Sequence, residues 1–224
     1  MLFLVRHAHA HYRPDESRGL STSGWREAGR LADLLQGRGI AWIVSSPSTR
    51  AVQTVQPLAD RLDLSIELDP DLRERLLSAG PVDDFERRVE ATWRDFDLAH
   101  PGGESNASAQ ARMTRAIHRI ARSAGNRHVA IATHGNVLAL FLRTLDPSVG
   151  FEFWARMSMP DLYVVDVPAG AAWSYRRAWP HAATADGSGG SSLAPWASPS
   201  PQVARRTGRP PADEAARGAD TSPS

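Results

Sequence analysis

The start of the chain contains the feature that most restricts how it can fold. Residues 1–5 form an uninterrupted apolar run, which stops abruptly at Arg6 and His7. A run of this length predicts a strand buried on both faces, as in a parallel sheet covered by helices. The two polar residues then lie at the carboxyl edge of the sheet, where ligands bind in open α/β folds. Arg6 offers a rigid set of donors that matches phosphate, and His7 can act as a nucleophile on phosphorus.

Composition excludes several classes of protein. The 224 residues are 42% apolar, which is enough for the core of one large domain or two small ones. A formal net charge of +1 gives no reason to expect nucleic acid or an anionic membrane as a partner. The absence of cysteine excludes disulfides, thiolate catalysis and cysteine-bound metal. No run approaches the length of a membrane helix, and residues 1–5 are too short for a signal peptide, so we expect a cytoplasmic protein.

Apolar runs alternate with segments of helical periodicity up to Leu145. The runs cover residues 1–5, 40–44, 64–68 and 128–132. This alternation predicts a single α/β domain with a mostly parallel central sheet and helices on both faces. Two later runs, residues 162–167 and 173–179, flank a Pro-Ala-Gly turn and predict an antiparallel hairpin at the sheet edge.

Prolines and a change in composition give further expectations. Pro57 should kink or interrupt the helix after the second run. Pro81 should open a helix with an inward apolar face. The members of that face are Val82, Phe85, Val89, Trp93 and Phe96. From about residue 182 the sequence becomes rich in Gly, Ser, Pro, Ala and Arg, so we expect a domain over residues 1–181 and a disordered tail over 182–224.

Three predicted strand ends carry polar groups to the same sheet edge. The first strand ends in Arg6 and His7, the second leads to Arg50 in the first turn of a helix, and the last ends in His134-Gly135 at a helix start. Helix N-termini present free amide donors and favour anions. Together, these groups predict a pocket for a dianionic phosphoryl group.

The order of these motifs resembles the histidine phosphatase superfamily, also called phosphoglycerate mutase-like. The matching segments are Val5-Arg6-His7-Ala8, Ser46-Pro47-Ser48-Thr49-Arg50-Ala51-Val52-Gln53-Thr54, Leu72-Arg73-Glu74, Gly102-Gly103-Glu104-Ser105 and His134-Gly135. The resemblance covers roughly residues 1–180 and is specific because both order and spacing agree. One departure is Ala8, which stands where the family has glycine and is tolerated if its φ is negative.

The resemblance implies a role for each matched residue. His7 would be the nucleophile that forms a phosphohistidine, and Arg6, Arg50, His134 and Gly135 would bind the phosphoryl group, with His134 also serving catalysis. Glu74 would protonate the leaving oxygen and later activate water. Glu104 is a rival for the acid, although its position at a helix start favours a capping role. No metal or other cofactor is required, because the guanidinium groups can take the place of Mg²⁺.

These observations predict a phosphoric monoester hydrolase. Its substrate would be a small phosphorylated molecule or a phosphoprotein, the latter because the Arg-His-Ala-x-Ala form also resembles small phosphohistidine phosphatases of the superfamily. His9 and Arg13 are expected to make the pocket mouth cationic. The short segment between Glu74 and Gly102 leaves little room for the insertion that mutases use, so hydrolysis is favoured over phosphoglycerate mutase activity. A catalytically silent phosphate-binding protein is the non-enzymatic alternative, and the oligomeric state stays open.

Overall fold

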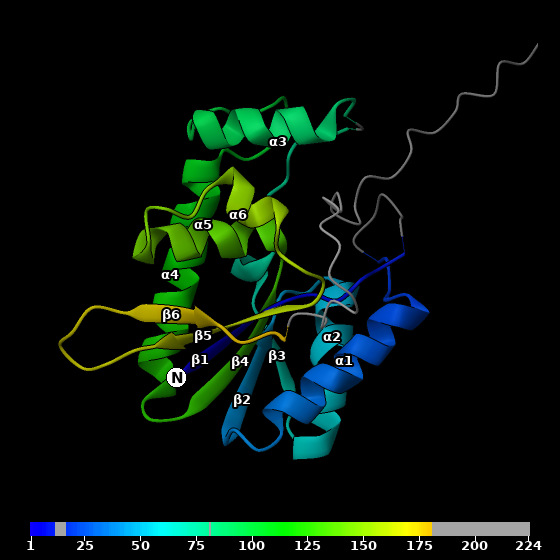
Figure 1. Cartoon of the computed structure of the whole chain (residues 1–224), viewed down its shortest axis with the longest axis vertical. Coiled ribbons are helices and arrows are strands. Elements are labelled where there is room, and N and C mark those ends of the chain that lie inside the picture. Colours follow the sequence, from blue (N-terminus) through cyan, green and yellow to red (C-terminus); the bar gives the residue numbers. More distant parts are fainter. Residues whose placement is uncertain (12–16, 81, 181–224) are drawn as a thin grey trace, which may run out of the picture. The chain divides into compact units, whose positions relative to one another are not determined.

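A six-stranded sheet forms the centre of the protein (Figure 1). The structure, a computed structural model, describes residues 1–11, 17–80 and 82–180. The strands are β1 (Leu2–Arg6), β2 (Ile40–Ser45), β3 (Ile66–Leu68), β4 (His128–Thr133), β5 (Asp161–Asp166) and β6 (Ser174–Arg177), in the spatial order β3-β2-β4-β1-β5-β6. The first four strands in that order run parallel, whereas β5 pairs antiparallel with both β1 and β6. The predicted α/β class and the antiparallel hairpin at the sheet edge are confirmed.

Strand β1 lies in the middle of the sheet and is buried over its whole length. Its side chains alternate between two separate clusters of apolar residues. Leu2 and Leu4 pack into one cluster, while Phe3 and Val5 pack into the other. An apolar run without polar alternation is therefore required, because both faces of the strand are covered.

Helices cover both faces of the sheet, as predicted. On one face lie α1 (Thr22–Leu35) and α2 (Thr49–Leu62), which pack side by side (Figure 1). The other face is covered by α4 (Asn106–Ala124) and α5 (Gly135–Leu145), with α3 (Phe85–Arg94) and α6 (Phe151–Ala155) packed against the same apolar cluster. A short 3₁₀ helix, η1 (Pro70–Leu72), follows β3.

Local sequence signals explain where the principal helices begin. Ser21 caps α1 by accepting a hydrogen bond from the Gly24 backbone N–H, and Ser105 caps α4 by accepting one from Ser108. Both are N-cap side chains that satisfy an amide the helix itself leaves without a partner. Gly125 ends α4 with a φ of 57°, a conformation that glycine adopts without a steric penalty.

Some expectations about individual helices are wrong. Of the expected kink or interruption at Pro57, the interruption is absent, because α2 continues to Leu62. The proline removes only one backbone donor, and burial of Val55, Leu58 and Ala59 keeps the helix on the sheet. Helix α3 begins at Phe85, and Phe85 is 46% exposed instead of facing inward. Helix α6 has no counterpart among the predicted elements.

Some predictions concern residues that the structure does not describe. Pro81, Arg13 and the proposed tail over residues 182–224 lie outside the described residues. Among the residues that are described, no helix is long and apolar enough to cross a membrane.

Candidate functional site

The three predicted strand ends meet at one edge of the sheet. Strand β1 pairs with β4 so that Arg6 lies opposite Thr133, and the His7 backbone N–H donates to the Thr133 carbonyl at 3.0 Å. Strand β2 lies on the other side of β4 and leads into α2, which carries Arg50. As a result, the His7 and His134 rings lie 5.2 Å apart, and the Arg50 Nε donates to His7 Nε2 at 3.3 Å.

The hydrogen bonds of His7 define which nitrogen can attack. Its Nδ1 lies 2.7 Å from the carbonyl oxygen of Ala8. A carbonyl can only accept, so Nδ1 carries the proton of the neutral ring and Nε2 keeps its lone pair. The nitrogen that keeps its lone pair therefore faces the Arg50 guanidinium, which can contact an oxygen of a phosphoryl group bound there.

The surroundings keep both histidines neutral. Burial lowers the pKa of His7 well below 6.5, and the positive charges of Arg50, Arg6 and Arg18 lower it further. For His134 burial is again the largest cause, followed by its proximity to His7 and the same three arginines. A neutral imidazole is the form that can act as a nucleophile, so this environment suits attack on phosphorus.

Arg6 is fixed in place by the backbone. Its Nη1 donates to the carbonyl oxygen of Met157 at 2.7 Å, while its Nε is buried and has no hydrogen-bond partner among the described residues. The guanidinium lies directly against Gly135, where an added Cβ would come within 2.8 Å of Nε. Glycine is therefore needed here because the arginine approaches the backbone closely.

Like Arg6, His134 has one nitrogen with a hydrogen-bond partner and one nitrogen without a partner in the described chain. It is fully buried at the N-cap position of α5, and its Nε2 lies 2.8 Å from the hydroxyl oxygen of Ser46. The Ser46 hydroxyl has one hydrogen and also lies 3.4 Å from Ser48 Oγ; when it gives this hydrogen to His134 Nε2, Nδ1 carries the ring proton. Within the described chain this Nδ1 has no partner, so it can donate to a bound oxyanion.

Glu74 lies at the start of α5, next to these groups. Its Oε2 accepts from the Asn136 backbone N–H, and its Oε1 accepts from that of Val137, each at 3.1 Å. The Arg75 N–H donates to Oε1 at 2.9 Å. In this structure the helix-start amides of Asn136 and Val137 thus hold the Glu74 carboxylate, whereas the sequence suggested that such amides would bind phosphate.

Glu104, the rival acid, has a different environment. Its carboxylate is bound by Arg112 through Nε at 3.0 Å and Nη2 at 2.6 Å. Arg112 Nη1 also donates to the carbonyls of Asp71 and Arg73, so the pair fixes the segment before Glu74. The side chain that caps α4 is Ser105, and Glu104 instead holds Arg112. The expected capping role of Glu104 is therefore wrong.

The replacement of glycine by Ala8 is accommodated. Ala8 is fully buried, and it is not among the residues with positive φ, which outside glycine are Asp63 and Asp84 in the described chain. Its backbone N–H donates to Thr54 Oγ1 at 2.9 Å. The segment after His7 is thus tied to α2, and the condition of a negative φ is met.

Some residues of the site were not predicted individually. Ser46 and Thr54 contact it, and their positions within the second motif were the signal that could have identified them. Arg18 lies close enough to lower the pKa of both histidines, but nothing in its local sequence marks it. His9, expected at the pocket mouth, is exposed and bonds to Ser21 Oγ at 2.8 Å.

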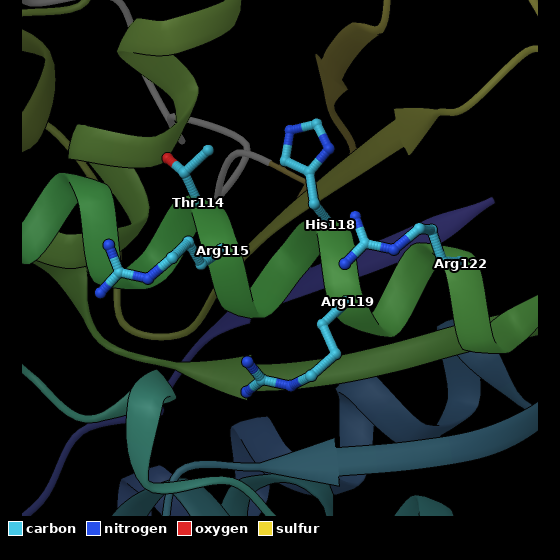
Figure 2. Close-up of a pocket in the computed structure, with 5 residues that line it drawn as sticks. All are labelled: Thr114, Arg115, His118, Arg119 and Arg122. Atoms are coloured by element: carbon cyan, nitrogen blue, oxygen red, sulfur yellow. The ribbon is translucent and has the colours of Figure 1, made fainter.

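A separate pocket lies on the surface of α4. Figure 2 shows its side chains along successive turns of the helix, namely Thr114, Arg115, His118, Arg119 and Arg122. Arg119 binds the carboxylates of Asp69 and Asp71, and the His118 ring stacks on Trp173 at 4.5 Å. None of these five residues belongs to the group at the sheet edge, and we assign this surface no part in the chemistry. Among the described residues no cluster of three or more His, Asp or Glu side chains could hold a metal ion.

Comparison with known families gives one match that covers most of the chain. The sequence model of the histidine phosphatase superfamily (branch 1) matches residues 2–170. This range includes the His7, Arg50, Glu74 and His134 positions.

Curated relatives match at moderate identity. An uncharacterised protein of Mycobacterium tuberculosis strain H37Rv is 35% identical over 120 residues, covering 50% of this chain and 59% of the relative. A bifunctional protein of that strain is 30% identical over 190 residues, covering 78% of this chain and 52% of the relative. The chain thus spans about half of the length of these relatives. A probable phosphoglycerate mutase of Yersinia enterocolitica is 28% identical over 159 residues, covering 64% of this chain and 74% of the relative.

Solved structures share the fold. A mycobacterial glucosyl-3-phosphoglycerate phosphatase is 25% identical with a TM-score of 0.60, covering 72% of this chain and 87% of that one. YhfR of Bacillus stearothermophilus superposes with a TM-score of 0.65 at 24% identity, covering 79% of this chain and 94% of that one.

Proposed function

Because the chain belongs to the histidine phosphatase superfamily, we propose that it hydrolyses phosphomonoesters through a phosphohistidine formed at His7, without a metal ion. One observation carries this proposal. A neutral imidazole whose Nε2 lone pair faces Arg50 lies among buried polar groups, and two of their nitrogens, Arg6 Nε and His134 Nδ1, have no partner in the described chain. Buried donors without partners are rare in folded proteins, and a phosphoryl group would satisfy them.

In the first step, His7 Nε2 attacks phosphorus and the bond between phosphorus and the ester oxygen breaks. Arg6, Arg50 and His134 bind the equatorial oxygens, over which negative charge spreads in the transition state. Glu74 gives its proton to the leaving oxygen, so the alcohol departs neutral.

In the second step, a water oxygen attacks the phosphohistidine. Glu74, now ionised, takes a proton from this water, and the electron pair of the phosphorus–nitrogen bond returns to Nε2. Phosphate leaves, and the histidine is again neutral with its proton on Nδ1. Two backbone amides of α5 hold Glu74, which supports a fixed position for this acid and base.

The substrate is proposed as a small phosphorylated molecule, or a phosphoprotein segment that can reach His7. The similarity to a mycobacterial phosphatase of glucosyl-3-phosphoglycerate supports a small substrate. Phosphoglycerate mutase activity is the second candidate, because a probable mutase is 28% identical over 64% of this chain. A mutase transfers the phosphoryl group to a second substrate faster than to water, and it needs a bisphosphorylated primer.

The test is hydrolysis of p-nitrophenyl phosphate by the wild type and by His7→Ala and Glu74→Ala, each with and without EDTA. The proposal requires activity that survives EDTA and is lost in His7→Ala, with a decrease in Glu74→Ala of roughly a hundredfold or more, as for a general acid. Glu86→Gln, which removes an exposed carboxylate from the first turn of α3, is the matched control and should keep the wild-type activity.

Other results would point to other functions. Activity that persists in His7→Ala would contradict the proposal. Phosphoryl transfer to a second substrate that exceeds hydrolysis and depends on a bisphosphorylated primer would identify a mutase. Vanadate binding by the wild type without turnover of any ester would identify the catalytically silent phosphate-binding alternative.

A further inference from the structure

One exposed face of α4 is positively charged, and the helix carries no acidic residue to balance it. Its 19 residues include four arginines and neither Asp nor Glu. Arg112 is buried against Glu104, but Arg115, Arg119 and Arg122 are exposed and line a shallow hollow of about 300 Å³. Arg122 follows Arg115 by seven residues, so both point to the same side of the helix. We call these two residues the α4 stripe.

Exposed arginines on other helices have an acidic neighbour about one turn away. Such pairs are Arg30–Glu27 on α1, Arg94–Glu90 on α3 and Arg156–Glu152 on α6. Neither arginine of the α4 stripe forms a hydrogen bond or an ion pair within the part of the chain that the structure describes. The stripe thus carries two positive charges that the protein does not balance locally, and such a surface attracts negative charge.

The groups beside the α4 stripe make the positive surface narrow. Figure 2 shows His118 and Arg119 pointing to opposite sides of the helix, with the stripe between them. On one side, the His118 ring stacks on Trp173 of the β5–β6 connection. On the other side, Arg119 is already bound to the carboxylates of Asp69 and Asp71. Duplex nucleic acid would bring its phosphates against these carboxylates, so the surface favours a single narrow segment of anionic chain.

We infer that the α4 stripe docks an acidic segment of a partner protein. Arg115 and Arg122 are separated by about 10 Å along the helix axis, at 1.5 Å per residue. Carboxylates two turns apart on an acidic helix have the same spacing, and each arginine presents a fork of donors that matches one carboxylate. The stripe takes no part in the chemistry proposed above, so this inference does not depend on the proposed function.

The test is binding of a fluorescein-labelled acidic peptide to the full chain, followed by fluorescence anisotropy. The probe consists of three copies of Glu-Ala-Ala-Glu-Ala-Ala-Ala, and the same peptide with Gln in place of Glu is the uncharged reference. The wild type is compared with Arg115→Glu/Arg122→Glu. The matched control is Arg26→Glu/Arg87→Glu, which changes the net charge by the same amount at exposed positions of α1 and α3.

The wild type should bind the Glu peptide more tightly than the Gln peptide, and its affinity should fall as salt is added, because exposed charges are screened. In Arg115→Glu/Arg122→Glu the Kd should rise roughly tenfold, since two attractive contacts become repulsive. Arg115→Lys/Arg122→Lys keeps both charges and should retain most of the affinity. At an ionic strength of about 0.1 M charges more than about 10 Å apart are largely screened, so the control should keep the wild-type Kd.

Equal affinity of the wild type for the two peptides would overturn the inference. An equal rise in Kd for both double Glu variants would also overturn it, because binding would then follow net charge alone. Tighter binding of duplex DNA than of the Glu peptide, weakened by the same stripe variant, would make nucleic acid the partner instead. Circular dichroism checks that each variant is folded, and Arg115→Gln/Arg122→Gln replaces the Glu variant if that one does not fold. Binding is measured without turnover, so failure of the proposed function leaves these outcomes unchanged.

Discussion

His7 is polarised by contacts on both of its ring nitrogens. The Ala8 carbonyl holds the proton on Nδ1, and Arg50 faces the lone pair on Nε2. Both contacts come from groups that cannot exchange their roles, since a carbonyl never donates and a guanidinium never accepts. The tautomer required for attack is therefore imposed by the fold before any substrate binds.

The neutral state of His7 and His134 leads to a prediction about stability. Both have a pKa below 6.5 in the folded protein, chiefly because of burial, so between 6.5 and the folded pKa only the unfolded chain takes up these protons. The free energy of unfolding should thus be greatest above pH 6.5 and fall as the pH decreases below it. The slope should reach about 1.4 kcal/mol per pH unit for each histidine.

Urea unfolding at pH 7.5, 6.5 and 5.5 measures this slope. His7→Asn removes one of the two titrating groups, so its stability should decrease less steeply than that of the wild type between pH 6.5 and 5.5. Parallel curves for the two proteins would contradict a neutral, buried His7.

Gly135 is predicted to be essential for the position of Arg6. In Gly135→Ala the new methyl group would lie 2.8 Å from Arg6 Nε and 2.9 Å from Cζ, so the guanidinium must move. Because Arg6 is buried and held by the Met157 carbonyl, we expect kcat/KM for p-nitrophenyl phosphate to fall by roughly a hundredfold, as when one preorganised donor is lost. Gly29→Ala is the control, since a Cβ at Gly29 meets nothing within 4 Å. Similar activity of both variants would show that Arg6 does not need this contact.

Helices α3, α4 and α5 are joined by a chain of buried amides. Trp93 Nε1 donates to Asn136 Oδ1, Asn136 Nδ2 donates to Asn106 Oδ1, and Asn106 Nδ2 donates to the Thr92 carbonyl. Asn136 also presents the backbone N–H that holds Glu74. The network thus connects the packing of three helices to the position of the proposed acid.

Asn106→Ala should therefore affect both stability and activity. It leaves Asn136 Nδ2 and the Thr92 carbonyl without their partners, and we expect a loss of about 1–3 kcal/mol in unfolding free energy. The kcat for p-nitrophenyl phosphate should also fall, because the start of α5 is less constrained. Asn126→Ala, at an exposed position after α4, should change stability by less than about 0.5 kcal/mol. Equal urea midpoints for the two variants would argue against the network.

Most of the elements could be predicted from the sequence, and the exceptions have physical reasons. Buried strands such as β1 and β4 are recognisable because both faces are covered, which requires continuous apolar runs. Helix α6 has only five residues, fewer than two turns, so no periodicity can develop. Phe85 continues the apolar pattern of α3 but stands at its first position, beyond the surface that α3 buries.

At the scale of the whole molecule, the site combines groups that are far apart in the sequence. The proximity of His7, Arg50 and His134 could be predicted because each follows a strand within a recognisable motif. The contacts that fix them could not, because they depend on loop conformations. Arg6, for example, bonds to Met157, which lies 151 residues further along the chain.

The segment that contains Met157 is anchored by a buried carboxylate, Asp161. It is fully buried and accepts hydrogen bonds from Arg177 Nε at 2.8 Å and from the Ser158 backbone N–H at 3.1 Å. Tyr163 also donates its hydroxyl to this carboxylate, and burial raises the pKa of Tyr163, so that it stays protonated. Asp161 thus connects the edge strand β6 to the segment that holds Arg6.

Removing this charge should weaken the fold and the site together. In Asp161→Asn the partly buried Arg177 loses its counter-ion, and breaking such a pair typically destabilises a protein by about 3–5 kcal/mol, with a smaller value expected here because Arg177 reaches solvent. Glu152→Gln removes a similar charge from the exposed pair with Arg156, which should contribute less than about 1 kcal/mol. Urea unfolding and kcat/KM are measured for both variants. Loss of activity in Asp161→Asn under conditions where the variant is fully folded would show that Arg6 is positioned from the sheet edge. Full activity in that folded variant would mean that the Met157 segment keeps its place without Asp161.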